Sequence, residues 1–162
     1  MITDVNGVIV MDDVKAYLQQ VKLCNSHIRN MIHKKAELQD IALQVTSPLK
    51  ADVVSCGGGK RDKVGTAGAA IADLDKKLDE KIAKYTSLID EIRAVVEEVD
   101  NSDQLNLLLW MYFGEYEADI HETYYLTLME VAVRLRTSYR NACYIHGAAL
   151  QAVAKVLERT KG

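Results

Sequence analysis

Proline and aromatic residues are scarce in this chain of 162 residues. It contains one proline, and aromatic residues make up only 6% of it. Apolar residues make up 49%, which is typical of a globular protein and not of a disordered one. The remainder is rich in Ala, Leu, Lys, Asp and Glu, a balance that favours helices over strands. We therefore expect an all-α protein.

Long apolar runs and a cysteine framework are also lacking. The longest apolar run, residues 107–113, is far too short to cross a bilayer, and no basic-then-apolar N-terminal pattern suggests a secretory signal. The three cysteines are odd in number and have no framework spacing, which fits reduced thiols. These absences predict a cytoplasmic protein with no membrane partner.

The formal net charge of −3 conceals an uneven distribution. Residues 1–126 hold 14 basic and 21 acidic side chains, a net charge of −7, whereas residues 127–162 hold 6 and 2, a net charge of +4. A basic patch confined to one segment suits phosphate attraction even when the whole protein is mildly acidic. Ordinary surface charge is the alternative interpretation.

Two long helices are predicted in residues 1–100, the first of two predicted domains. Residues 12–46 repeat apolar side chains at helical spacing, and residues 66–99 repeat them in the alternating three- and four-residue steps of a coiled coil. Pro48 ends the first helix, because proline disfavours helical geometry in the residue before it. Each helix would extend about 50 Å, so the two can pair as a long antiparallel hairpin. A glycine-rich connector at 47–65 joins them.

The apolar stripes on these helices are wider than one seam, since Ile32 lies beside Ile28 and Met31. A hairpin alone would leave part of each stripe uncovered. Either a second copy of the hairpin, forming a four-helix bundle, or the C-terminal domain folding back would cover it. We expect a homo-oligomer formed through the N-terminal hairpin.

The second predicted domain, residues 101–162, holds a helix-turn-helix. Residues 101–103 break the long helix and offer a cap for a third one, from Gln104 to about Tyr116. A polar and aromatic connection of uncertain structure follows at 115–125. Thr127 can cap a short helix, and Ser138 can cap a final helix that continues through Leu157. The expected outward side of this last helix carries Tyr139, Arg140, Cys143 and Tyr144.

Two segments carry a family resemblance. Residues 128–150 resemble the helix-turn-helix of sigma factor region 4 at Thr127, Leu128, Glu130, Val131, Leu135, Ser138, Ala142, Ile145, Ala149 and Leu150. Residues 46–48, 57–59, 62–65 and 70–74, with the recognition-helix residues 138–140 and 145–150, resemble a phage and prophage family from low-GC Gram-positive bacteria. In that family a coiled-coil hairpin precedes a sigma-region-4-like domain. The similarity covers nearly the whole chain.

The resemblance implies double-stranded DNA as partner and, by analogy with the RinA and ArpU types of phage late-gene regulator, control of transcription in the cytoplasm of a bacterial host. The residues that match its DNA-reading positions, or that add phosphate attraction beside them, are Ser138, Tyr139, Arg140, Cys143, Tyr144, Arg134 and Arg136. Lys155 and Arg159 are further candidates for phosphate attraction. Two departures from the pattern are Cys143 with Tyr144, where Arg and Gln are typical, and a longer insertion at 114–126.

The sequence gives only weak indications of a phosphate loop, a zinc site or a catalytic site. Residues 57–60, Gly-Gly-Gly-Lys, lack the spacing and the preceding strand of a phosphate loop, so a flexible connector is favoured. Lys60, Arg61 and Lys63 are candidates for nonspecific DNA contacts. The pairs Cys24 with His27 and Cys143 with His146 have a spacing that zinc could use, but they are far apart in sequence. We predict no metal, no cofactor and no catalytic residues, because no Ser-His-Asp order or carboxylate pair can be singled out.

Two other functions are compatible with this organisation. A small terminase-like packaging protein would also join DNA-binding helices to an oligomerising coiled coil. A protein-interaction module that keeps the sigma-like fold and binds RNA polymerase would suit the acidic N-terminal part and the modest basic patch.

Overall fold

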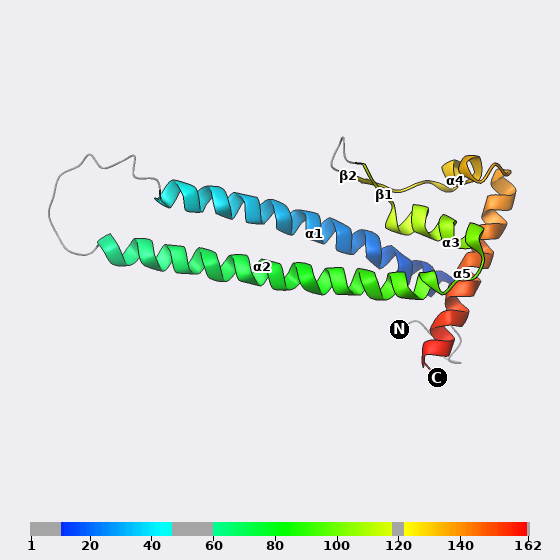
Figure 1. Ribbon diagram of the computed structural model, residues 1–162, viewed down its shortest axis with the longest axis horizontal. Coiled ribbons are helices and arrows are strands. Elements are labelled where there is room, and N and C mark those ends of the chain that lie inside the picture. Colours follow the sequence, from blue (N-terminus) through cyan, green and yellow to red (C-terminus); the bar gives the residue numbers. More distant parts are fainter. Residues whose placement is uncertain (1–10, 47–59, 118–121, 162) are drawn as a thin grey trace. The chain divides into compact units, whose positions relative to one another are not determined.

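The computed structural model describes residues 11–46, 60–117 and 122–161, and these are mostly helical, as the composition predicts (Figure 1). In chain order the elements are α1 (Met11–Thr46), α2 (Lys60–Glu97), α3 (Ser102–Leu108), the π-helical turn η1 (Leu109–Phe113), strands β1 (Glu115–Glu117) and β2 (Glu122–Tyr124), α4 (Leu128–Arg134) and α5 (Tyr139–Lys161). The two strands have three residues each and were not predicted, but they leave the structure consistent with an all-α fold. Within the described residues, no helix combines the length and the apolar character needed to span a membrane.

The chain divides into two compact units, and α1 and α2 contribute to both. One unit comprises Asn25–Thr86, and the other comprises Met1–Cys24 together with Ser87–Gly162. The C-terminal end of α2 therefore groups with the elements that follow it. Helix α2 begins at Lys60 instead of Thr66, so the last part of the predicted connector is helical. The triglycine at 57–59 lies outside the described residues.

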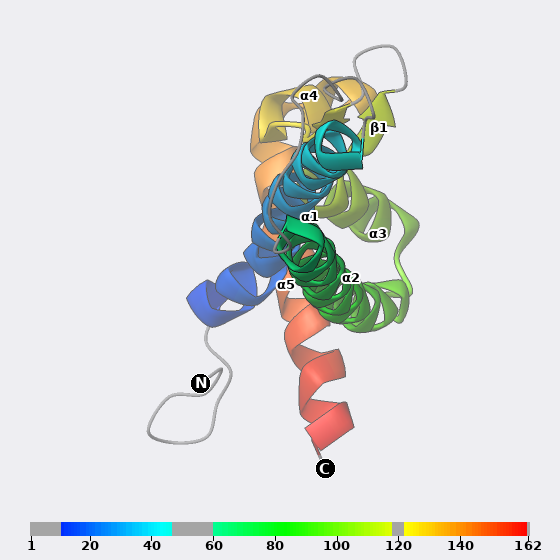
Figure 2. The same ribbon diagram turned by 90° about the vertical axis from the view of Figure 1, so that its left-hand side faces the viewer.

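In the unit Asn25–Thr86, α1 and α2 run side by side in opposite directions (Figures 1 and 2). The ring of His27 on α1 stacks on that of Tyr85 on α2, with centroids 5.2 Å apart. The residues that are at least half-buried repeat at three- and four-residue steps: Asn25, Ile28, Met31, Lys35, Leu38 and Ala42 on α1, and Ile71, Asp75, Leu78, Ile82 and Tyr85 on α2. This spacing is that of a two-stranded coiled-coil seam.

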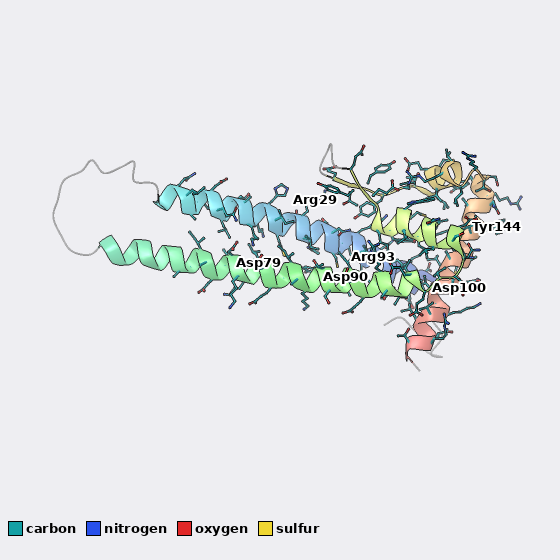
Figure 3. The ribbon with its side chains drawn as sticks, in the orientation of Figure 1. Arg29, Asp79, Asp90, Arg93, Asp100 and Tyr144 are labelled. Carbon is teal, nitrogen blue, oxygen red and sulfur yellow. The ribbon has the colours of Figure 1, made fainter. Side chains whose placement is uncertain are left out.

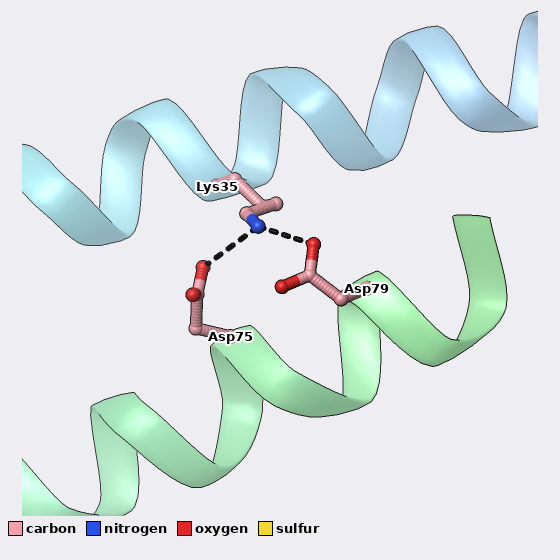
Figure 4. Close-up of polar contacts among 3 residues, drawn as sticks. All are labelled: Lys35, Asp75 and Asp79. Atoms are coloured by element: carbon pink, nitrogen blue, oxygen red, sulfur yellow. Dashed lines mark hydrogen bonds and ion pairs between the residues drawn. The ribbon is translucent and has the colours of Figure 1, made fainter. Parts of the chain in front are cut away.

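The seam contains charged side chains that an apolar pattern overlooks. Lys35 reaches across from α1 and lies between Asp75 and Asp79 of α2 (Figure 4). Its ammonium nitrogen is 3.5 Å from Asp75 Oδ1 and donates a hydrogen bond to Asp79 Oδ1. This hydrogen bond is the main cause that raises the pKa of Lys35. In coiled coils a polar contact at a seam position specifies how the helices align, so we predict this role for the contact between Lys35 and Asp75.

The core of the other unit joins the N-terminal end of α1 to the C-terminal elements. Val14, Leu18 and Val21 of α1 are buried, and they belong to one apolar cluster with residues of α2, α3 and α5: Ile92, Val96, Leu107, Leu108, Leu150 and Val153. The alternative in which the C-terminal domain folds back is thus realised at this end of α1. Ile32, in the unit Asn25–Thr86, remains 55% exposed.

The predicted third helix is wrong in its extent. Asn101 caps it as expected, since its side chain accepts hydrogen bonds from the backbone N–H groups of Asp103 and Gln104. The α-helix ends at Leu108, however, and η1 takes over until Gly114, whose N–H donates to Leu109 O at 2.9 Å. Strand β1 then pairs antiparallel with β2, with Tyr116 opposite Thr123.

Gly114 makes the change from helix to strand possible. Its φ of 73° and ψ of 179° lie in a region that is essentially restricted to glycine. A Cβ at this position would lie 2.7 Å from Thr123 Cγ2 and 2.7 Å from the carbonyl oxygen of Tyr124. The second strand returns the chain to η1, where Leu126 N–H donates to Trp110 O at 3.0 Å.

Candidate nucleic-acid interface

The first helix of the candidate interface, α4, begins at a complete capping box. The Thr127 hydroxyl accepts a hydrogen bond from the Glu130 N–H, and the Glu130 carboxylate in turn accepts one from the Thr127 N–H at 2.7 Å. Glu130 also accepts a hydrogen bond from the Tyr124 hydroxyl. That bond is the largest cause that lowers the pKa of Glu130, followed by the bonds from Thr127. Reciprocal capping satisfies backbone donors that the first turn leaves free and fixes where α4 starts.

The turn between α4 and α5 is closed by backbone bonds and by an arginine in an uncommon conformation. Arg136 has a positive φ of 52°, and its N–H donates to Val133 O. Thr137 N–H donates to Ala132 O at 2.9 Å, which is the pattern of a helix end closed by a left-handed residue. This conformation is usually taken by glycine or asparagine, so the residue type gave no sign of it.

Ser138 starts α5 through its side chain. Its hydroxyl accepts a hydrogen bond from the Asn141 N–H at 3.2 Å, and the Asn141 side-chain amide donates to Thr137 Oγ1 at 2.8 Å. These bonds hold the first turn of α5 against the preceding turn. The start of α5, where candidate DNA-contacting residues are concentrated, is therefore held in place.

Small residues bring α4 and α5 together on their inner sides. Ala132 and Ala142 are buried, and α4 packs against α5. Val131, Ala149 and Leu150 are also buried, while Leu128, Leu135 and Ile145 are half-buried against the same core. Because alanine has no side chain beyond Cβ, the two backbones can approach closely. The inner face is occupied by packing, so contacts with a partner fall to the outer face.

The outer face of α5 presents most of the candidate residues. Tyr144 is 64% exposed and Tyr139 is 50% exposed, and Ser138 and Arg140 are exposed as well. Cys143 is half-buried between them. Figure 3 labels Tyr144 on α5. A guanidinium, two phenol rings and a hydroxyl thus share one accessible surface at the start of a helix.

Arg134 and Arg136 differ in how they are held. Arg136 is exposed in the turn. Arg134 lies at the end of α4, where its Nη1 is 2.5 Å from Glu115 Oε1 of β1 and its guanidinium carbon is 4.9 Å from the centre of the Trp110 ring. The hydrogen bond that Arg134 donates to Glu115 is the largest cause that raises the pKa of Arg134. The insertion at 114–126 therefore supplies a partner for an arginine of the candidate interface.

Two apolar residues beside this interface were not predicted from the sequence. Met129 and Val133, one helical turn apart on α4, are 58% and 74% exposed. With Tyr124, Leu126, Glu130 and Arg134 they line a shallow hollow of about 400 Å³. The spacing of Met129 and Val133 was the available signal, because neither falls on the stripe formed by Leu128, Val131 and Leu135.

Lys155 and Arg159 lie away from the start of α5. Arg159 follows Arg140 by 19 residues of one uninterrupted helix, about 28 Å at 1.5 Å per residue. Both side chains line a hollow of about 350 Å³ that also contains Glu98 and Asp100. The acidic neighbours offset their charge, so we leave both residues out of the candidate interface.

The residues whose spacing zinc could use, Cys24 with His27 and Cys143 with His146, lie among side chains that do not complete a metal site in the described residues. His146 lies 3.0 Å from the hydroxyl oxygen of Tyr112, and His27 stacks on Tyr85. Cys24 is buried, and burial raises the pKa of its thiol. Across residues 11–46, 60–117 and 122–161, no three His, Cys, Asp or Glu side chains are grouped so that they could hold a metal ion.

Comparison of the chain with protein-family models, curated proteins and solved structures gave no match.

Proposed function

We propose that this protein is a phage-encoded, sigma-region-4-like transcriptional regulator that binds duplex DNA and catalyses no reaction. The supporting observation is the pair α4 and α5. Ala132 and Ala142 are buried on their inner sides, while the first turns of α5 present Tyr139, Arg140 and Tyr144 to solvent. A two-helix unit that keeps the start of its second helix accessible matches the way helix-turn-helix proteins enter the major groove.

The proposed docking assigns a role to each exposed group. Arg140 reads a guanine edge or binds a phosphate, because its guanidinium offers donors in a fork that matches either acceptor pair. Tyr139 and Tyr144 contact thymine methyl groups or the sugar-phosphate backbone. Ser138 and Cys143 border these contacts. Arg136, exposed in the turn, adds phosphate attraction that positions the protein without reading sequence.

The test of this docking compares two arginines on the same helix. Arg140→Ala should weaken binding to a labelled duplex by roughly 1–3 kcal/mol if Arg140 contacts a base, and by less at a phosphate. Arg159→Ala removes the same charge about 28 Å further along α5 and should leave affinity nearly unchanged. Fluorescence anisotropy at one fixed salt concentration measures both. Equal effects of the two substitutions would remove Arg140 from the interface.

The target is found by capturing phage genomic DNA with the purified protein at a stated salt concentration. Enrichment upstream of late genes supports a transcriptional regulator. Enrichment at a packaging site supports the terminase-like alternative instead. Absence of enrichment, together with absence of binding to any duplex, would refute both DNA-based functions.

We further propose that the hairpin of α1 and α2 mediates self-association. Ile32 and Leu43 are exposed apolar residues 11 positions apart on α1, a separation that returns to the same helical face. A second copy that covered this face would remove their apolar surface from water. Light scattering should then give a mass above that of the monomer. Ile32→Glu with Leu43→Glu should lower that mass to the monomer value while the helical content is retained.

A protein-interaction module is the second candidate function. It is favoured by the exposed pair Met129 and Val133 and by the hollow that they line with Tyr124. Exposed apolar residues at helical spacing beside a hollow are typical of a surface that binds another protein. Copurification of host RNA polymerase that is lost on Val133→Asp, with no measurable DNA affinity in any variant, would select this function.

A further inference from the structure

Glu115 and Arg134 join the 114–126 insertion to the candidate DNA interface. The Glu115 carboxylate lies 2.5 Å from Arg134 Nη1, and the Trp110 ring lies against the same guanidinium. Both charged side chains are about half-exposed, so solvent and other ions can reach the pair. Arg134 is thus available to a partner only in competition with Glu115.

A carboxylate and a phosphate present arginine with the same chemistry, namely two or more oxygen acceptors that carry negative charge. The β1–β2 hairpin adds further negative charge at this place, since Glu117 of β1 and Glu122 of β2 lie opposite each other at its far end. A duplex approaching Arg134 therefore meets acidic side chains as well as the arginine. The repulsion between these carboxylates and the phosphates opposes binding.

We propose that the β1–β2 hairpin competes with DNA for Arg134. Glu115 binds the Arg134 guanidinium and thereby lowers the affinity of α4 and α5 for phosphate. The proposal rests on the DNA-binding function proposed above. When DNA binds, Arg134 exchanges the Glu115 carboxylate for a phosphate oxygen and remains near Trp110. Any factor that draws the hairpin away raises the affinity for DNA, so the insertion adjusts binding strength without contacting a base.

The principal test is a double-mutant cycle on Glu115 and Arg134. The probe is a labelled mixed-sequence duplex titrated between about 50 and 200 mM salt, where phosphate contacts dominate affinity. Glu115→Gln should tighten binding by about two- to fivefold, the range expected when an exposed ion pair no longer competes. The slope of log affinity against log salt should stay close to that of the wild type, because Arg134 contacts a phosphate in both complexes. In an Arg134→Gln background, Glu115→Gln should have little effect.

Glu117→Gln is the matched control, because it removes the same charge two residues further along β1 and no bond joins Glu117 to Arg134 in the described residues. Its effect should be small and the same with or without Arg134.

Equal tightening by Glu115→Gln and Glu117→Gln, independent of Arg134, would show general repulsion and overturn the specific competition. Unchanged affinity in Glu115→Gln, with DNA binding intact, would overturn the competition but leave the proposed function standing. Absence of duplex binding in every variant, even at low salt, would overturn both.

A second measurement does not depend on substituting Arg134. Trp110 is the single tryptophan of the chain, so its fluorescence reports on the guanidinium that lies against it. Duplex binding should change the emission of the wild type. Glu115→Gln without DNA should move the emission toward the DNA-bound value, because Arg134 has then lost its carboxylate. Emission that is unaffected by both would contradict an exchange at Arg134.

Discussion

Tyr112 and His146 form a hydrogen bond between η1 and α5, with 3.0 Å between the Tyr112 hydroxyl oxygen and His146 Nε2. Their rings are also stacked, with centroids 6.1 Å apart. Burial lowers the pKa of His146, and the charge of Lys15 lowers it further. The neutral imidazole is thereby favoured, and in the tautomer that carries its proton on Nδ1 the Nε2 atom accepts a hydrogen bond from the Tyr112 hydroxyl. This contact links the core of α1, η1 and α5 to the protonation state of one side chain.

Stability should fall as the pH drops below the ordinary pKa of histidine, 6.5. The unfolded chain binds a proton on His146 at a higher pH than the folded chain, so acid favours unfolding. The free energy of unfolding begins to fall near pH 6.5. It stops falling below the lowered pKa of His146 in the folded state, where His146 is protonated in both states. Urea unfolding followed by circular dichroism across this range measures how steeply the free energy of unfolding depends on pH. His146→Gln should make this dependence shallower, whereas the same change at exposed His33 should not.

Gly114→Ala should destabilise the protein by at least about 1–3 kcal/mol, because alanine must then adopt a conformation restricted to glycine. The added Cβ would also meet Thr123 Cγ2 and Tyr124 O, each at 2.7 Å. Gly147→Ala is the matched control, since Gly147 lies within α5 and a Cβ there would have no neighbour within 4 Å in the described part of the chain. The control should stabilise by about 0.5–1 kcal/mol, as alanine does in a helix interior. Changes of the same sign in the two unfolding curves would contradict the role assigned to Gly114.

Thr127→Ala should destabilise by about 1 kcal/mol through loss of the capping box at α4. Thr127→Ser keeps the hydroxyl and should lose little. Hydrogen exchange offers a local measurement, because the Glu130 N–H loses its acceptor in the alanine variant and should exchange faster. Equal exchange rates for Glu130 in the alanine and serine variants would mean that the hydroxyl does not hold this amide.

The elements that could be predicted from sequence are those set by local signals. Asn101 and Thr127 act as caps, because their side chains accept hydrogen bonds from backbone N–H groups two or three residues ahead. Helix α1 extends to Thr46, and the predicted stop at Pro48 lies outside the described residues. The buried face of α5 follows from the spacing of Ala142, Ile145 and Ala149. Period and capping need no knowledge of distant parts of the chain, which is why these features were accessible.

The features that sequence did not predict depend on residues that are distant along the chain or unusual in conformation. The π-helical turn and the strands after it require Gly114 at a positive φ and pairing across the β1–β2 hairpin, neither of which leaves an apolar period. The partner of Arg134 is 19 residues away at Glu115. In the candidate site, the exposure of Tyr139, Arg140 and Tyr144 agrees with the helical period of α5, whereas the insertion's contact with Arg134 has no sequence signature.

Asp75 depends on Lys35 for its counter-charge in the hairpin seam. Asp75 Oδ1 is buried and accepts no hydrogen bond within the described residues, although Lys35 lies 3.5 Å away. Replacing Lys35 alone by Leu should therefore destabilise the hairpin, because the Asp75 carboxylate would lose its counter-charge. Lys35→Leu with Asp75→Leu removes both charges from the seam and should be more stable than either single variant.

The double variant should gain stability but lose the single alignment of its two helices. A seam without a charged pair tolerates more than one alignment and more than one number of strands. Thermal unfolding gives the order of stability, and light scattering gives the distribution of masses, which should broaden in the double variant. Asp79→Asn is the control, because it leaves the Lys35 and Asp75 charges in the seam and should retain the mass distribution of the wild type. A double variant with a single, unchanged mass would show that the contact between Lys35 and Asp75 does not determine how the helices align.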